Sequence, residues 1–153
     1  MRLVIAVLLV AGVANGQPGD WAPKRDPFDP NVVARWKQLL AHDPHDAVPL
    51  AKLEQLYRSF RTLDALEAEF AEHDDASSLI VRARMHAERK DDAGALALYQ
   101  HAAALAPDDA RTWLAIGGLA HVATGKSPEQ TKALAREAYE HALAAQPPAP
   151  IVE

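Results

Sequence analysis

The chain of 153 residues contains no cysteine, which excludes disulfide bonds, thiolate metal sites and a cysteine nucleophile. Glycine occurs only 7 times and aromatic residues make up 6% of the sequence, whereas 32 residues are alanine. Because alanine is the strongest helix former and glycine a weak one, this balance predicts an all-α protein. The formal net charge of −5 argues against duplex nucleic acid as a partner, since proteins that bind it usually present a basic face.

The N-terminus has the layout of a cleavable secretory signal over residues 1–16. Arg2 is followed by an apolar stretch from 3 to 14, and the small residues Ala14 and Gly16 close the segment. The stretch is shorter than the roughly 20 apolar residues of a membrane span. We therefore expect export to the periplasm or another extracellular or envelope space, with no membrane span in the mature chain. An uncleaved N-terminal anchor is the alternative.

Proline-rich segments flank the body of the chain. Residues 17–30 hold four prolines, which preclude a continuous helix and predict an extended leader. This leader is either a flexible tether or docks on the body through Trp21 and Phe28. Residues 148–153 form a proline-rich tail, so the predicted helical domain covers 31–147.

Three segments of the body share one pattern, in which an aromatic residue is followed eight residues later by a proline. They are Trp36–Pro44, Tyr99–Pro107 and Tyr139–Pro147. Each is typical of a helix that ends at a proline. The prolines are 63 and 40 residues apart, which fits two units of about 32 residues and then one of about 34 with a short insertion.

This period resembles the tetratricopeptide repeat, a helix–turn–helix unit of 34 residues. The large, small and proline positions of that repeat are filled in the second and third units, by Leu79, Ala83, Ala95, Tyr99, Ala102 and Pro107, and by Trp113, Gly117, Ala135, Tyr139, Ala142 and Pro147. Arg82 departs from the pattern at an apolar position. In the shorter first unit, Glu54 stands where a small residue is expected.

We predict seven helices, at 31–42, 47–60, 63–73, 76–89, 92–105, 109–123 and 128–146. Aspartates and one serine precede them as helix caps: Asp46, Asp64, Asp74/Asp75, Asp91/Asp92, Asp108/Asp109 and Ser127. The resemblance implies antiparallel helix pairs stacked as a short right-handed α-solenoid, with about three units and an extra N-terminal helix. Small residues are expected where helices cross, with Trp113, Tyr99 and Tyr139 at the flanks.

The resemblance also implies a concave groove, lined by the first helix of each unit, that binds an extended peptide. The residues expected to face it in the three units are Val48, Ala51, Lys52, Gln55, Arg58 and Ser59; Ser77, Ile80, Val81, Arg84, Ala87 and Glu88; and Arg111, Leu114, Ala115, Gly118, His121 and Val122. The candidate binding residues among them are Lys52, Gln55, Arg58, Arg84, Arg111 and His121. Four cations in an acidic protein favour a ligand with carboxylates, such as a protein C-terminus. Alternatively, they are the solvated charges of any helix surface.

The sequence gives little support for a catalytic site or a metal site. The cluster His42-Asp-Pro-His45-Asp46 contains possible zinc ligands, but Pro44 ends a helix and Asp46 is a cap. His101 and His141 are expected on the surface, and His86 is expected as a half-buried packing residue. No serine lies in a Gly-x-Ser-x-Gly elbow and no phosphate-binding glycine loop is present. We therefore predict no catalytic residue, no metal site and no cofactor.

The leading hypothesis is a non-enzymatic scaffold that holds a partner polypeptide in its groove. One alternative comes from residues 107–147, which resemble the terminal repeats of periplasmic chaperones for apocytochrome c maturation. Another is a zinc-dependent or carboxylate-based enzyme that uses the residues from His42 to Asp46. Such a stack usually ends in a polar capping helix, whereas here the last predicted helix leads into a proline-rich tail. Either that helix caps the stack itself, or a partner or second copy covers it, or the sequence is a fragment of a longer chain. Self-association is therefore a further alternative.

Overall fold

The computed structural model describes residues 28–122 and 127–145, and these residues confirm the all-α class, with no strand among them. The elements are α1 (Pro30–His42), α2 (Ala47–Phe60), α3 (Leu63–Ala71), α4 (Ala76–Glu88), α5 (Asp92–Leu105), α6 (Ala110–Leu119), the 3₁₀ turn η1 (Ala120–Val122) and α7 (Pro128–Ala145). The predicted signal segment 1–16, most of the leader and the tail 148–153 lie outside the described residues.

The predicted bounds agree with the observed helices to within two residues, except at the end of α6. Helix α6 ends at Leu119, four residues before the predicted end, because its last turn tightens into η1. Helix α1 begins at Pro30, which we had assigned to the extended leader. Proline suits the first turn of a helix, where its missing N–H has no partner to lose, and Asp29 supplies the cap.

Acidic caps set most of the helix starts, as predicted. The side chains of Asp46, Asp75, Asp91 and Asp109 each accept a hydrogen bond from a backbone N–H in the first turn of the following helix. For α3 the prediction was wrong, because Thr62 is the cap and Asp64 lies within the first turn. Ser127 and Gln130 exchange two hydrogen bonds at the start of α7, which is a capping box.

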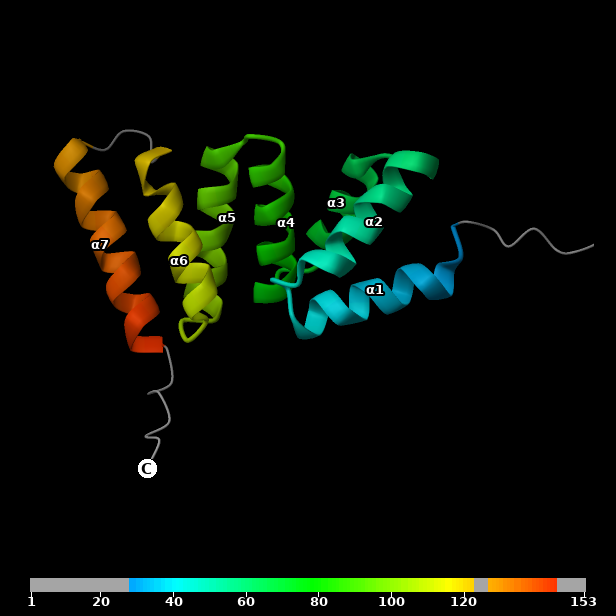
Figure 1. Cartoon of the computed structure of the whole chain (residues 1–153), viewed down its shortest axis with the longest axis horizontal. Helices are drawn as coiled ribbons and strands as arrows, with labels where there is room; N and C mark the ends of the chain where they lie inside the picture. Colours follow the sequence, from blue (N-terminus) through cyan, green and yellow to red (C-terminus); the bar gives the residue numbers. More distant parts are fainter. Residues whose placement is uncertain (1–27, 123–126, 146–153) are drawn as a thin grey trace, which may run out of the picture.

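Consecutive helices pack against each other, and α1 also contacts α4 (Figure 1). Helices α4 to α7 stand side by side, while α1 runs in a different direction at the lower end of α2 and α4 and packs mainly against these two helices. Two hydrophobic cores result, one over α4 to α7 and one among α1 to α4. Helix α4 belongs to both, because Leu79 and Ala83 face the first core while Val81 and Met85 face the second.

Small residues lie where the helices cross. Ala95, Ala102, Ala142 and Gly117 are buried, as predicted, and Ala135 is half-buried. Of the large residues predicted beside them, Tyr99 is buried in the α4–α7 core, whereas Tyr139 is 43% exposed. Close packing of two helices requires small side chains at the crossing, and larger ones at its flanks fill the remaining volume.

Trp113 is only half-buried, so it is less enclosed than the repeat pattern predicts. Its ring stacks on the imidazole of His141, with ring centres 4.3 Å apart, and its indole N–H donates to the carbonyl oxygen of Pro107 over 2.7 Å. His141 is exposed, as expected, but it also covers the tryptophan. The pair links α6 to α7 at the surface.

Candidate functional site

The predicted groove residues come from α2, α4, α6 and η1, but the structure does not bring them together as one open surface. Ile80 and Val81, which we expected to face the groove, are buried, so that part of the prediction is wrong. Val81 packs in the core with Leu40 of α1 and Leu53 of α2. Because α1 contacts α4, it covers part of the helix face that the repeat pattern leaves open.

The turn between α1 and α2 lies on the predicted groove. Arg84 of α4 donates from Nη1 to the carbonyl oxygens of Pro44 and Asp46, over 2.5 and 2.9 Å. Ser77 Oγ donates to the carbonyl oxygen of Ala41 over 3.2 Å. Arg84 therefore binds the turn between α1 and α2 and does not face an open groove.

The same turn reaches α6. Arg111 pairs with Asp43 over 2.8 Å, and His45 Nε2 lies 2.7 Å from Asp109 Oδ2. The bond from Arg111 holds the pKa of Asp43 below its usual value. Burial opposes ionisation of Asp109, but hydrogen bonds from Thr112 and His45 outweigh it and lower the pKa of that carboxyl. Two of the four predicted groove cations, Arg84 and Arg111, are thus bound to the α1–α2 turn of their own chain.

The segment from His42 to Asp46 therefore has a structural explanation. Helix α1 ends at His42, Pro44 is buried in the turn, and Asp46 caps α2. His45 faces Asp109. Across residues 28–122 and 127–145, no three side chains of the metal-binding types gather into a group that fits an ion.

Arg58 borders a hollow of about 360 Å³ between α2 and α4, lined by Ala51, Glu54, Gln55, Arg58, Ser59 and Glu88. Its guanidinium lies 3.5 Å from Glu54 and 4.0 Å from Glu88. Burial and the neighbouring Glu88 carboxyl raise the pKa of Glu54 to about 7. The departure from the repeat pattern at Glu54 was the one sequence signal for this pair of carboxyl groups.

Lys52 and Gln55 line a second hollow, of about 220 Å³, on the other side of α2. The remaining lining residues are Val32 and Trp36 of α1 and Leu56, Ser59 and Phe60 of α2. Among the described residues, Lys52 has no ion pair. His121 lies far along the chain in η1, where its Nδ1 is 3.0 Å from the carbonyl oxygen of Gly118.

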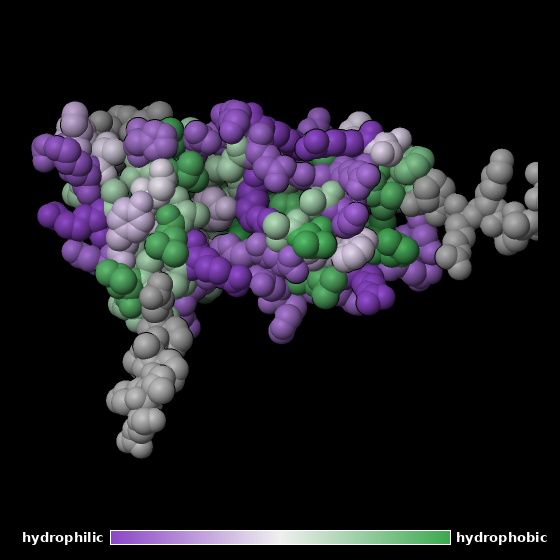
Figure 2. Space-filling view, in the orientation of Figure 1, coloured by the Kyte–Doolittle hydropathy of each residue, from purple (hydrophilic) through white to green (hydrophobic). Residues whose placement is uncertain are grey.

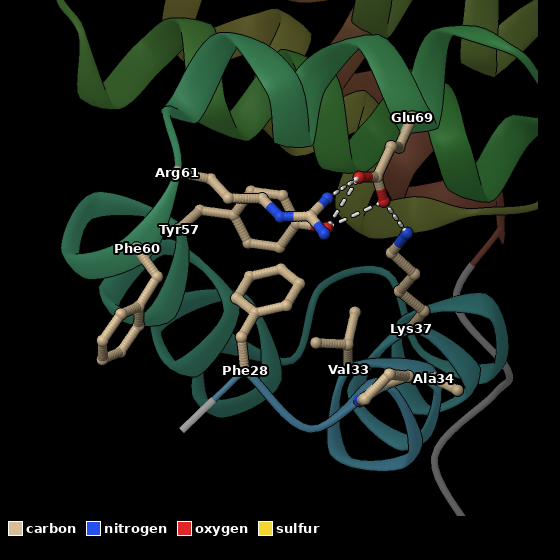
Figure 3. A pocket seen from close by; sticks show the side chains of 9 residues that line it. Phe28, Val33, Ala34, Lys37, Tyr57, Phe60, Arg61 and Glu69 are labelled. Carbon is tan, nitrogen blue, oxygen red and sulfur yellow. Dashed lines mark hydrogen bonds and ion pairs between the residues drawn. The ribbon is translucent and has the colours of Figure 1, made fainter. Parts of the chain in front are cut away.

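A third hollow, of about 590 Å³ and larger than the two above, was not predicted from the sequence (Figure 3). Both carboxylate oxygens of Glu69 of α3 lie 2.8 Å from the Tyr57 hydroxyl, which donates its single proton to this carboxylate. Glu69 also binds Lys37 and Arg61. Phe28 packs edge-on against Tyr57, and Arg61 lies over the Phe28 ring. Three helices meet here, and no periodic pattern marks these residues.

The polar groups of this hollow satisfy one another. Burial opposes the charge of Glu69, but hydrogen bonds from Lys37 and Tyr57 hold its pKa below the usual value. Burial and the same carboxylate raise the pKa of Tyr57, so its hydroxyl keeps its proton at neutral pH. The arrangement ties α1 to α2 and α3.

His86 links three elements through two carboxylates. Its Nε2 is 2.8 Å from Glu67 of α3, and its Nδ1 is 2.7 Å from Asp91, the cap of α5. Burial opposes protonation of His86, but hydrogen bonds to Asp91 and Glu67 outweigh it and raise the pKa of the imidazole. Arg89 adds a second cation at Glu67, over 2.7 Å. The side chain is half-buried, as expected, with these polar partners in addition.

No family model matches the chain, and no curated protein matches its sequence at a significant level. In the part of the chain that the structure describes, no helix is long and apolar enough to cross a membrane. Interpretation of function therefore rests on the geometry of the hollows and on the sequence pattern.

Proposed function

We propose that this chain is a non-enzymatic interaction module of the tetratricopeptide type that holds a partner polypeptide. In this proposal, the helix pairs α2–α3, α4–α5 and α6–α7 form a short right-handed α-solenoid, and α1 is an extra N-terminal helix. Support comes from the packing of consecutive helices and from small residues such as Gly117 and Ala102 at the crossings. The repeat pattern of the sequence points the same way.

One observation carries the binding role: the exposed face of α2 borders two hollows. Lys52 and Gln55 line the one beside α1, and Gln55 and Arg58 line the one beside α4. Lys52 is exposed and has no ion pair among the described residues, so it is available to a carboxylate of a partner. Arg84 and Arg111 are already engaged by the α1–α2 turn. We therefore place the binding face at α2, at one end of the predicted groove.

Export is part of the same proposal and is supported by the pattern of residues 1–16. N-terminal sequencing of the protein from the exported fraction tests it. A mature chain that begins at Gln17 is the expected result. Recovery of the whole chain in the cytosol would contradict export, and an intact N-terminus in the membrane fraction would identify an uncleaved anchor.

Site-specific photocrosslinking in cells tests the binding role. A photoreactive amino acid replaces Gln55 on α2 in one variant and the exposed Gln100 on α5 in the control. We expect the first variant to crosslink to a distinct polypeptide, identified by mass spectrometry, and the control to lack that product. A Gln55 variant that forms no specific adduct, or the same adducts as the control, would contradict a binding face on α2.

Self-association is a second candidate, favoured by the outer surface of α7. Leu143 on this helix is 71% exposed, the largest exposure among the large hydrophobic residues of the described regions. Light scattering of the wild type and of Leu143→Asp distinguishes the two candidates. A wild-type oligomer that dissociates in the variant would support self-association, whereas a wild-type monomer would exclude it.

A further inference from the structure

Helices α1 and α2 have an unusual charge for an acidic protein. Helix α1 contains no aspartate or glutamate, and α2 contains only Glu54, whose side chain is 8% exposed. The cations of the two helices are Arg35, Lys37, Lys52 and Arg58. The exposed charged side chains within these two helices are therefore all cations, in a chain with a net charge of −5.

Two of these cations have no partner of opposite charge within the described regions. Lys37 binds Glu69, and Arg58 lies near Glu54 and Glu88. Arg35 and Lys52 are exposed and form neither an ion pair nor a hydrogen bond with described residues. Their charges are available to a ligand.

Exposed hydrophobic side chains gather beside them. Figure 2 shows apolar residues over α1 and α2 on this face of the molecule. Val32 and Leu39 of α1 are 43% and 41% exposed, and Val48 and Phe60 of α2 are 59% and 53% exposed. Val32, Trp36 and Leu39 follow one another at steps of four and three residues, which places them on one side of α1.

The apolar surface is hollowed. The hollow of about 220 Å³ between α1 and α2 is lined by Val32, Trp36, Leu56 and Phe60, with Lys52 at the same site. Arg35 lies three residues after Val32 and four before Leu39, so it borders the apolar stripe on the outer side of α1. A groove between two helices with cations at its edges is suited to a third helix.

We infer that the groove between α1 and α2 binds an acidic amphipathic helix of a partner protein. The partner's apolar side chains, spaced three and four residues apart, enter the hollow beside Trp36 and Phe60. Its carboxylates meet Lys52 and Arg35. The inference rests on the proposed interaction role and specifies the face and the chemistry of the partner. Opposite charge at the edges sets the orientation, while the apolar contacts supply most of the affinity.

A displayed library of 16-residue peptides, in which Leu, Phe, Ala, Gln, Ser, Glu and Lys are equally frequent, tests the chemistry. The full-length chain is the bait, and enriched peptides are measured by fluorescence anisotropy. We expect enriched peptides to carry net negative charge, with apolar residues three or four apart. Enrichment of basic or uncharged peptides would overturn the inference.

Two pairs of matched variants test the site. Arg35→Glu with Lys52→Glu reverses the free charges, and Phe60→Asp alters the apolar lining; all three side chains are exposed, so little stability is at risk. The controls are Arg136→Glu, at an exposed cation of α7, and Leu105→Asp, at an exposed apolar residue of α5. We expect about tenfold weaker peptide binding for the first pair and a change within about twofold for the controls. Thermal melts verify that each variant is folded.

The outcomes separate this inference from the proposed function. Peptides that bind all variants equally would place the site elsewhere, and the interaction role would stand. No enriched peptide would overturn both. An anionic membrane surface is the other ligand that could offer negative charge beside apolar groups, and binding to vesicles of neutral and of anionic lipid tests it. Binding to anionic vesicles that depends on Lys52 and Phe60, without any peptide binding, would show a membrane surface as the ligand and overturn the partner helix.

Discussion

Tyr139 of α7 packs its ring directly on Gly117 of α6. A methyl group at Gly117 would lie 2.6 Å from Cε1 and 2.7 Å from Cζ of that ring. The neighbouring Gly118 points to open space, with no atom within 4 Å of an added methyl group. Of these two adjacent glycines, only Gly117 therefore lies where an added side chain would meet the neighbouring helix α7.

We expect Gly117→Ala to destabilise the protein by about 1–2 kcal/mol. The added methyl group must displace the Tyr139 ring, and the cost stays modest because that side chain is partly exposed and can move. Denaturant unfolding measures the change. Tyr139→Ala combined with Gly117→Ala should cost less than the sum of the two single changes, because the clash is then absent.

Gly118→Ala is the matched control on the same helix. With space around it and a better helix former in place, the variant should be more stable than wild type by about 0.5–1 kcal/mol. Equal destabilisation by both substitutions would show that helix propensity or a different packing, not the Tyr139 contact, decides the effect at Gly117.

Local signals explain why the helices could be predicted. Asp46, Asp75, Asp91 and Asp109 bind N–H groups within the next few residues, so a short window of sequence contains the whole interaction. The small residues at helix crossings also recur at a fixed period. The all-α class and most helix bounds follow from these two signals.

The contacts of the α1–α2 turn could not be predicted in this way. His45 meets Asp109 across 64 residues, and Arg84 binds backbone carbonyls, which carry no sequence signature. The sequence pattern treats Arg84, Arg111 and Lys52 as equivalent cations. Of these three, Lys52 alone lacks a partner among the described residues. The contacts of Glu69 with Lys37, Tyr57 and Arg61 could not be predicted for the same reason, since these residues come from different helices and from the turn after α2.

Stability should depend on pH through His86. Its pKa is raised in the folded state, so its stabilising contribution is complete below the unfolded value of about 6.5 and is lost as pH rises through the folded pKa. Glu67 and Asp91 have lowered pKa values, so their contribution is lost only in acid. Melting temperatures of wild type should therefore fall as pH rises above about 6.5.

His86→Asn should remove this part of the pH dependence, because asparagine cannot take up the proton that allows His86 to donate from Nε2 to Glu67 and from Nδ1 to Asp91. His121→Asn is the control, since that imidazole is exposed and lies only against a backbone carbonyl. If the melting temperatures of wild type and His86→Asn changed equally with pH between pH 6 and 9, the role of the histidine would be disproved.

Glu54 should destabilise the protein when it is charged, whereas His86 stabilises it when charged. Its pKa is raised to about 7, so the folded state binds a proton that the unfolded state releases near pH 4.5. Stability is lost as pH rises from about 4.5 to 7, and above that range the buried carboxylate is a full penalty. Glu54→Gln should be more stable than wild type at pH 8, on the order of 1–2 kcal/mol, with little difference at pH 4.

Chemical unfolding at both pH values measures this effect. Glu129→Gln, at an exposed position of α7, is the control and should change stability little at either pH. If Glu54→Gln were less stable than wild type at pH 8, the ionised carboxylate would be bound favourably by Arg58, and the raised pKa would be wrong.

Arg82 should be replaceable with a gain in stability. It occupies an apolar position of the repeat pattern, and its buried Nε has no hydrogen-bond partner. Arg82→Met keeps the apolar stem and removes the unsatisfied group, so we expect a gain of about 1 kcal/mol. Arg136→Met, on the exposed side of α7, should have almost no effect in the same thermal melts.

Arg84 and Arg111 should differ in their contribution to stability, although the sequence pattern treats them alike. Arg84 is half-buried and donates to two backbone carbonyls of the α1–α2 turn, whereas Arg111 is exposed and forms a surface ion pair with Asp43. Removing a charged donor from a partly buried site costs about 1.5–3 kcal/mol, and an exposed ion pair contributes less than about 1 kcal/mol. Arg84→Met should therefore destabilise the protein more than Arg111→Met. Hydrogen exchange of the turn and of the first turn of α2 should accelerate in Arg84→Met alone. Equal losses in both variants would show that the turn is held by the charge of α4 and α6 together, and that the carbonyl contacts of Arg84 add nothing.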